Sequence, residues 1–138
     1  MKQREIFITQ FDEQRLGELI DAIESVDNHG RHDLTILKEE LESAIIVDSK
    51  DIPSHVVTMN SKVHLKDIDT ADEMTYTLVF PKNANIKEGA ISILAPIGAA
   101  ILGYKEGDVV EWKVPSGIRK ILIEKVIYQP EAAGDFHL

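Results

Sequence analysis

The spacing of apolar residues changes once along the chain, near residue 50, and this change constrains the fold more than any other feature. Before it, apolar residues recur three and four positions apart, as they do on one face of a helix. After it come short segments rich in β-branched and aromatic residues, which are typical of strands. Pro53 lies between the two patterns, where it would end a helix. We therefore expect an α+β protein with two parts, residues 1–48 and residues 49–138.

The first part predicts two antiparallel helices that pair as a short coiled coil. Thr9 and Asp12 resemble a capping box before a helix over roughly residues 10–26, and Asp33 is suited to cap a second helix. The two apolar seams are Leu16, Leu19, Ile23 and Val26, and Leu34, Leu37, Leu41 and Ala44. Arms of about 25 Å are too short to be stable alone, so we expect the base of the hairpin to rest on the second part.

The second part predicts a sheet with one packed helix. Strands are expected over residues 61–68, 75–80, 91–94, 109–114 and 120–128. Between the third and fourth lies the least polar stretch of the chain, "LAPIGAAILGYKEGD" at 94–108. Pro96 is suited to the first turn of a helix and Gly103 to its end. Because this helix has almost no polar face, we expect most of it to be buried against the sheet.

Composition excludes several classes of function. The chain has 138 residues, a formal net charge of −9 and no cysteine, which excludes disulfides, thiolate catalysis and cysteine-based metal sites. Scattered lysines and arginines under an acidic excess disfavour direct nucleic-acid binding. The apolar stretch is broken at Pro96 and is shorter than the ~20 residues of a bilayer span, so no membrane partner is expected. No apolar core of a signal peptide follows Met1, so we expect a cytoplasmic protein.

Motifs for catalysis are weak. The sequence contains no phosphate loop, dinucleotide fingerprint or nucleophile elbow. The expected turn between the helices contains residue types that also bind metal ions, namely His29 and His32 with Asp27 and Asp33 beside them. A polar, solvated turn is the interpretation that we favour. The predicted hairpin tip consists of Asp27, His29, Arg31 and Asp33. We expect neither a metal site nor a cofactor.

The helices also carry many carboxylates, which fit a solvated exterior, with a functional acidic surface as the alternative. They are Asp12, Glu13, Glu18, Asp21 and Glu24 on the first helix, and Glu39, Glu40 and Glu42 on the second.

Several segments resemble a known family. A coiled coil followed by a β-rich part with "APIGAAILG" and "GDVVEW" is similar to the bacterial Gre transcript-cleavage factors, whose carboxy-terminal domain has an FKBP-like fold. This likeness covers roughly residues 54–128. The segments "HVVTMNS" at 55–61 and "YQPEAAGD" at 128–135 are more similar still to the shorter Gre-like proteins named as regulators of nucleoside diphosphate kinase.

The resemblance implies binding to RNA polymerase. In Gre factors the FKBP-like domain docks at the rim of the polymerase secondary channel, and the coiled coil carries an acidic pair into it. The docking residues implied here are Pro96, Ile97 and Gly98, with Pro96 and Ile97 facing outward as an apolar anchor. The alternative, that both side chains belong to the core, stays open.

The hairpin tip departs from the Gre pattern. Gre hairpins are roughly twice as long, and helix length sets their reach. Asp27 and Asp33 flank a turn and do not reproduce the acidic pair. The resemblance therefore implies a non-enzymatic regulator that competes with Gre factors at the channel without stimulating transcript cleavage.

Two other functions stay open. An FKBP-like fold suggests a peptidyl-prolyl isomerase, although fold alone is a poor guide to activity, and only 6% of the residues are aromatic. A direct or indirect link to nucleoside diphosphate kinase is suggested by the name of the shorter Gre-like proteins.

Overall fold

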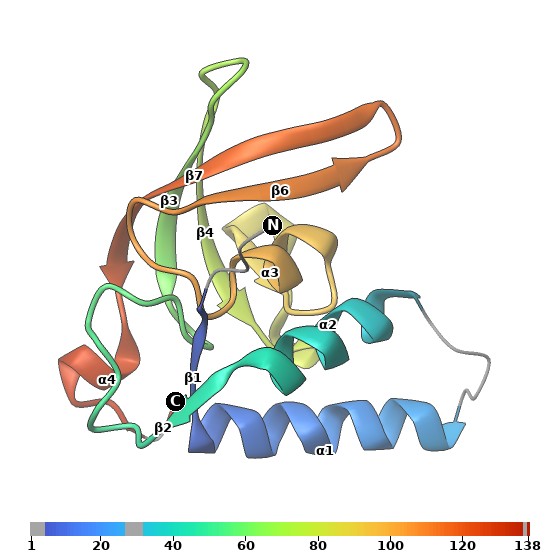
Figure 1. Ribbon diagram of the computed structural model, residues 1–138, viewed down its shortest axis with the longest axis vertical. Helices are drawn as coiled ribbons and strands as arrows, with labels where there is room; N and C mark the ends of the chain where they lie inside the picture. The colour runs from blue at the N-terminus through green and yellow to red at the C-terminus, as the bar shows by residue number, and fades with distance from the viewer. Residues whose placement is uncertain (1–4, 27–31, 137) are drawn as a thin grey trace.

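The computed structural model describes residues 5–26, 32–136 and 138. Two antiparallel helices lie near the start of the chain, α1 over Gln10–Val26 and α2 over His32–Ser43 (Figure 1). The predicted bounds of α1 are confirmed, and the Asp12 N–H donates to Thr9 Oγ1 at 3.0 Å, as a helix cap requires. Because α2 begins at His32, Asp33 lies inside its first turn and not at the capping position before it.

Two strands of three residues flank the helices and were not predicted. β1 spans Phe7–Thr9 and β2 spans Ile45–Val47, and they pair in parallel. The Phe7 N–H also donates to the Gly103 carbonyl at 3.1 Å. Strands this short show no alternation that a sequence pattern could reveal, and their pairing is non-local.

The main sheet has five strands, and all five predicted strands are confirmed. In chain order they are β3 over Lys62–Asp67, β4 over Glu73–Val79, β5 over Ala90–Ser92, β6 over Val109–Val114 and β7 over Gly117–Tyr128. Their order in the sheet is β5-β4-β3-β7-β6, and only β4 and β5 run parallel. Short 3-10 helices at Pro81–Asn83 (η1) and Ile86–Glu88 (η2) lie between β4 and β5, and a final helix, α4, spans Pro130–Ala133.

The apolar stretch forms helix α3 over Pro96–Ile101, as expected. Gly103 follows it with φ +84°, the left-handed geometry that ends many helices. Four of its six residues are buried, so the predicted burial of this helix is confirmed. In the described ranges 5–26, 32–136 and 138, no helix has both the length and the apolar character to cross a bilayer.

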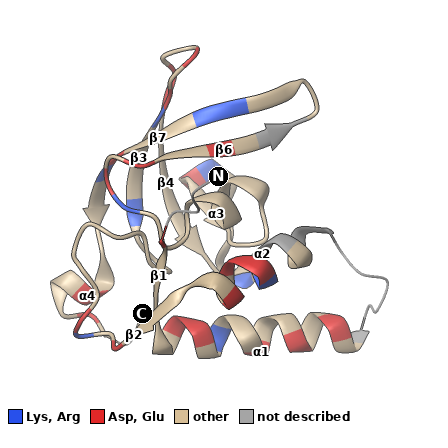
Figure 2. Cartoon of the chain, in the orientation of Figure 1, with Lys and Arg blue, Asp and Glu red and all other residues tan. Residues whose placement is uncertain are grey.

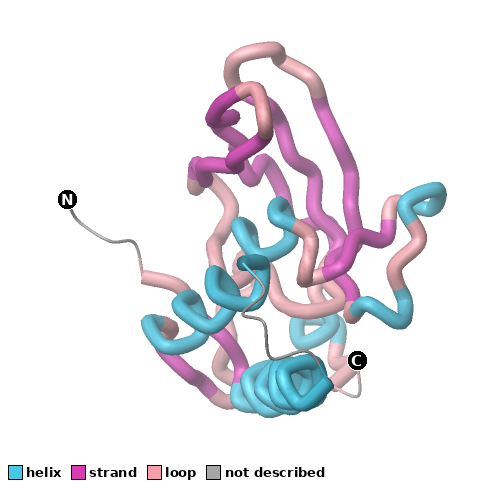
Figure 3. The backbone as a smooth tube through the Cα atoms, turned by 90° about the vertical axis from the view of Figure 1, so that its right-hand side faces the viewer, coloured by secondary structure: helices cyan, strands magenta, loops and turns pink. Residues whose placement is uncertain are grey.

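One hydrophobic core joins the helices to the sheet. Alternation on the strands points Val63 and Leu65 of β3 inward, while α1 contributes Leu16 and α2 contributes Leu37 to the same cluster. α2 packs against both α1 and α3 and lies between them, and the hairpin sits at one end of the sheet (Figures 1 and 3). The hairpin therefore rests on the body along α2 and not only at its base.

Carboxylates follow the helices, as Figure 2 shows for α1 and α2. Most of the predicted exterior set is exposed or half-buried, and Glu24 pairs with Lys38 across the two helices at 3.0 Å. Asp12 is the exception, because its residue is 0% exposed. The prediction that Asp12 belongs to the solvated exterior is therefore wrong.

Two glycines with similar backbones allow a test of how tightly β1 packs on the end of α3. Gly103 and Gly107 both have positive φ, but a Cβ at Gly103 would lie 2.9 Å from Ile6 Cβ, whereas a Cβ at Gly107 meets nothing within 4 Å. Gly107→Ala should lose about 1 kcal/mol of unfolding free energy from backbone strain alone. Gly103→Ala should lose at least about twice that, because the clash adds to the strain. Urea unfolding of both variants measures the difference. Equal losses of unfolding free energy would show that β1 moves aside at little energetic cost.

Candidate functional site

The predicted docking residues form the first turn of α3, called here the docking turn, Pro96 to Gly98. Ala95 precedes it in an extended conformation, and Pro96 occupies the first helical turn, where its missing N–H costs nothing. Pro96 is exposed, as expected. Ile97 is only 5% exposed and belongs to the core, so the prediction that it faces outward is wrong.

Gly98 is buried where the backbones of α3 and the preceding turn meet. A Cβ there would lie 2.5 Å from the Ser92 carbonyl oxygen and 3.2 Å from Ile93 Cα. The Ser92 side chain also holds this turn, because its Oγ accepts from the Leu94 N–H at 3.0 Å. Gly98 therefore lets α3 approach the chain that leads into it, and it does not itself offer a side chain to a partner.

The outward face of α3 is small and apolar. Pro96 and Ala100 are four residues apart and so share one face of the helix, and Ala100 is half-buried. Leu94 and Ala95, immediately before the helix, are half-buried too. Sequence reasoning missed Leu94 and Ala100, although the four-residue spacing from Pro96 to Ala100 was a usable signal.

The structure places little of the predicted hairpin tip. Asp27, His29 and Arg31 lie outside the described residues. Asp33 lies in the first turn of α2.

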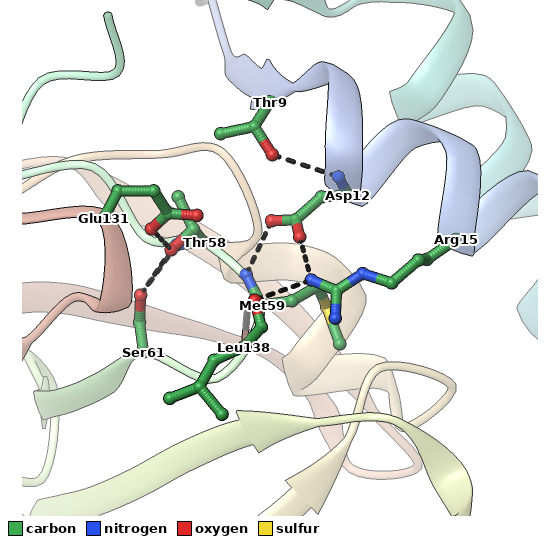
Figure 4. Close-up of polar contacts among 8 residues, drawn as sticks. All are labelled: Thr9, Asp12, Arg15, Thr58, Met59, Ser61, Glu131 and Leu138. Atoms are coloured by element: carbon green, nitrogen blue, oxygen red, sulfur yellow. Dashed lines mark hydrogen bonds and ion pairs between the residues drawn. The ribbon is translucent and has the colours of Figure 1, made fainter. Parts of the chain in front are cut away.

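A buried carboxylate joins α1 to the segment 55–61. Asp12 Oδ2 accepts from the Met59 N–H at 3.0 Å, and its Oδ1 accepts from the Arg15 guanidinium at 2.5 Å (Figure 4). Arg15 also donates to the Leu138 carbonyl at 2.9 Å. Its guanidinium lies over the rings of Phe11 at 3.8 Å and Phe80 at 4.9 Å, an arrangement in which the ring faces attract the cation.

The same network connects the two segments that carried the sequence resemblance. Thr58 Oγ1 donates to Glu131 Oε1 at 2.7 Å and lies 2.9 Å from Ser61 Oγ (Figure 4). Gln129 Nε2 donates to the carbonyls of Pro53 and Val56, each at 2.8 Å. Residues 55–61 and 128–135 are therefore neighbours that hold each other and α1, which gives their sequence a structural role.

Burial has the largest effect on the pKa of the two buried carboxylates, Asp12 and Glu131. It raises the pKa of Asp12 above its ordinary value, although the Met59 N–H and Arg15 favour the charged form. Burial likewise raises the pKa of Glu131, with the hydrogen bond from Thr58 opposing and the nearby charge of Asp12 adding to the rise. The junction therefore holds two carboxylates whose charged forms are disfavoured by burial, and Arg15 lies close to both.

An open groove of about 730 Å³ runs beside this junction and was not predicted. Arg15 and Leu19 of α1 line one side of it, and Phe80 and Lys82 line the other. No local pattern could have revealed it, because its walls are more than sixty residues apart in the chain.

Comparison with known protein families shows the family to which the chain belongs. The family described as "Transcription elongation factor, GreA/GreB, C-term" matches residues 52–128, which is more than half of the chain and contains the whole main sheet and α3. The chain therefore belongs to this family.

Three relatives show how much of the chain is shared with individual known proteins. Over its full length the chain is 34% identical to the whole of the regulator of nucleoside diphosphate kinase from Escherichia coli K12. It is 41% identical to transcription elongation factor GreA of Chloroherpeton thalassium, but that match covers 63% of this chain and 55% of the relative. A solved GreA/GreB structure from Nitrosomonas europaea is 37% identical, with a TM-score of 0.73 over 91% of this chain and 100% of that one. The resemblance to the Gre-like group stated from the sequence is confirmed.

The Asp12 contacts predict a large stability difference between two adjacent acids of α1. Asp12→Ala should lose about 3 kcal/mol, because it leaves the Met59 N–H and Arg15 without their buried acceptor. Glu13→Ala, at an exposed position in the same helical turn, should change stability by no more than about 0.5 kcal/mol. Denaturant unfolding measures both, and similar losses would contradict a central role for Asp12.

The variant Glu131→Gln measures how much the buried charge of Glu131 destabilises the folded state. A pKa raised by folding means that the charged form is disfavoured in the folded state, so this penalty is absent below the unfolded pKa and complete above the folded one. Glutamine keeps an acceptor for Thr58 and carries no charge. The variant should therefore gain stability relative to the native chain as the pH rises from about 4 to about 8. The urea unfolding midpoints of the variant and the native chain, measured at both pH values, test this. A stability gain of the variant that becomes smaller as the pH rises would refute it.

Proposed function

We propose that this protein is a non-catalytic regulator that binds RNA polymerase near its secondary channel and competes there with Gre-type factors. Membership of the GreA/GreB family supports it, as does a full-length relative named as a regulator. The proposal retains the sequence-based description of residues 1–48 as a coiled coil and residues 49–138 as an FKBP-like domain.

The observation that carries the proposal is the short hairpin. α1 has 17 residues and α2 has 12, which at 1.5 Å per residue gives arms of about 25 and about 18 Å. Much of α2 is also used in packing against α3 and the core, with Leu34 and Leu37 buried. A hairpin of this size supports occupancy of a channel entrance and does not support delivery of acidic groups to a distant active centre.

Pro96 is the proposed contact on the docking turn. It is exposed and apolar, and its ring and the half-buried Leu94 offer a rigid surface that costs little entropy to order on binding. Ile97 and Gly98 contribute by holding this surface in place from below, since both are buried.

Binding to core RNA polymerase tests the docking turn. We expect association at micromolar concentrations, and Pro96→Asp should weaken it by at least about tenfold, because a charge replaces an apolar contact. Ile68→Asp is the matched control, since Ile68 is an exposed isoleucine in the turn between β3 and β4 and lies outside the proposed contact. Absence of association, or equal effects of the two variants, would overturn the proposed docking.

Competition and cleavage assays test the mode of action. Increasing amounts of the protein should displace a Gre factor from polymerase and reduce factor-stimulated cleavage of the transcript in stalled complexes. The protein alone should leave the transcript uncut. Stimulated cleavage by the protein itself would contradict the non-catalytic assignment, while a Gre factor that stays bound at saturating amounts of the protein would contradict competition at a shared site.

A further inference from the structure

Three side chains from three adjacent strands meet on the solvent face of the main sheet. His64 lies on the central strand β3, Glu73 begins β4, and Glu124 lies on β7. Each offers one ligand atom, and these atoms all lie within 4.8 Å of one another. His64 Nε2 is 2.6 Å from Glu73 Oε1 and 3.3 Å from Glu124 Oε1.

An irregularity in β7 brings Glu124 to this face. His64 pairs with Lys125, but the next residue of β3, Leu65, pairs with Ile123, so Glu124 is an extra residue in the ladder. In a regular strand Glu124 would point to the opposite face from Lys125, whereas here both are exposed. Bulges of this kind turn a side chain to a new direction and are frequent beside functional sites.

The imidazole ring of His64 is held from its other side. Thr75 Oγ1 lies 2.9 Å from His64 Nδ1 and is suited to accept the proton of that nitrogen. A contact of 2.6 Å between Nε2 and the Glu73 carboxylate requires a proton on Nε2. A metal ion would bind in place of that proton. A hydrogen-bonded second nitrogen is the usual way in which a metal-binding histidine is oriented.

A divalent ion would take the place of a proton between the three groups. Two carboxylates carry two negative charges and a neutral imidazole carries none, so together they balance the charge of a divalent ion. Two ligands at about 2.1 Å from one tetrahedral ion lie roughly 3.4 Å apart. Glu124 Oε1, at 3.3 Å from His64 Nε2, already has this spacing, whereas Glu73 Oε1, at 2.6 Å, would have to move away from the ring.

We propose that His64, Glu73 and Glu124 form a binding site for a divalent transition-metal ion, with Zn²⁺ as the best match. One imidazole nitrogen and two carboxylate oxygens leave a fourth position for water, as in open zinc sites. Mg²⁺ and Ca²⁺ are excluded by chemistry, because they take oxygen ligands in preference to nitrogen. A proton on Nε2 is the competing occupant, and it would form an imidazolium ion pair with the same carboxylates.

Calorimetric titration with Zn²⁺ and with Mg²⁺ at neutral pH tests the site on the full chain. Zn²⁺ should bind in the micromolar range, and Mg²⁺ should give no saturable heat. His64→Ala and Glu124→Gln should each weaken Zn²⁺ binding by at least about tenfold, and Thr75→Val, which removes only the orienting hydroxyl, should weaken it by about tenfold. The ring signals of His64 in a nitrogen-proton NMR spectrum should shift on addition of Zn²⁺.

Two control variants separate this site from other histidines. His55→Ala removes an exposed histidine outside the cluster, and His29→Ala removes one from the segment of sequence between the two helices. Both should keep the affinity of the native chain, and thermal unfolding by circular dichroism checks that every variant is folded. Unchanged Zn²⁺ affinity in His64→Ala, or a His64 ring that titrates as an imidazolium and does not respond to Zn²⁺, would overturn the proposal in favour of the ion pair.

Discussion

The buried carboxylate of Asp12 fixes how the helices sit on the rest of the molecule. Its two oxygens are both used, one by the Met59 N–H and one by Arg15, while its own N–H donates to Thr9. These bonds reach β1, the body of α1 and the segment 55–61 at once. Because hydrogen bonds are directional, α1 cannot slide or turn on the sheet without breaking at least one of them, whereas apolar contacts alone would permit such shifts.

Holding charge at this junction has a cost that the aromatic rings help to offset. Asp12 and Glu131 are both buried carboxylates, and Arg15 is the cation close to them. The Arg15 guanidinium itself lies over the rings of Phe11 and Phe80, whose faces attract a cation. The junction is therefore specified by a few polar groups in fixed directions, while the sheet is stabilised by its alternating apolar residues.

The sequence predicted what depends on local patterns and failed where a contact is long-range. The bounds of α1 followed from a cap and a periodic seam, and α3 followed from Pro96 and Gly103. Ile97 was misplaced although the signal existed, since Ile97 and Ile101 share one face of the helix and Pro96 and Ala100 share the other.

Other features had no local signal at all. Asp12 was read as part of a solvated acidic surface because its partner Met59 lies 47 residues away. The cluster of His64, Glu73 and Glu124 depends on strand register and on one extra residue in β7, and neither can be deduced from the alternation of a single strand.

The shared core also constrains how the proposed docking could work. α2 packs against α3 as well as α1, and buried residues of all three belong to one cluster. In a close-packed interior, the position of one element fixes the positions of its neighbours to within a small displacement. If the docking turn is seated on polymerase, the direction of the hairpin is therefore set by its packing on the core and by the contacts of Asp12. Loosening the Asp12 junction should then impair competition with a Gre factor even where Pro96 still binds, because the hairpin would no longer be held across the entrance.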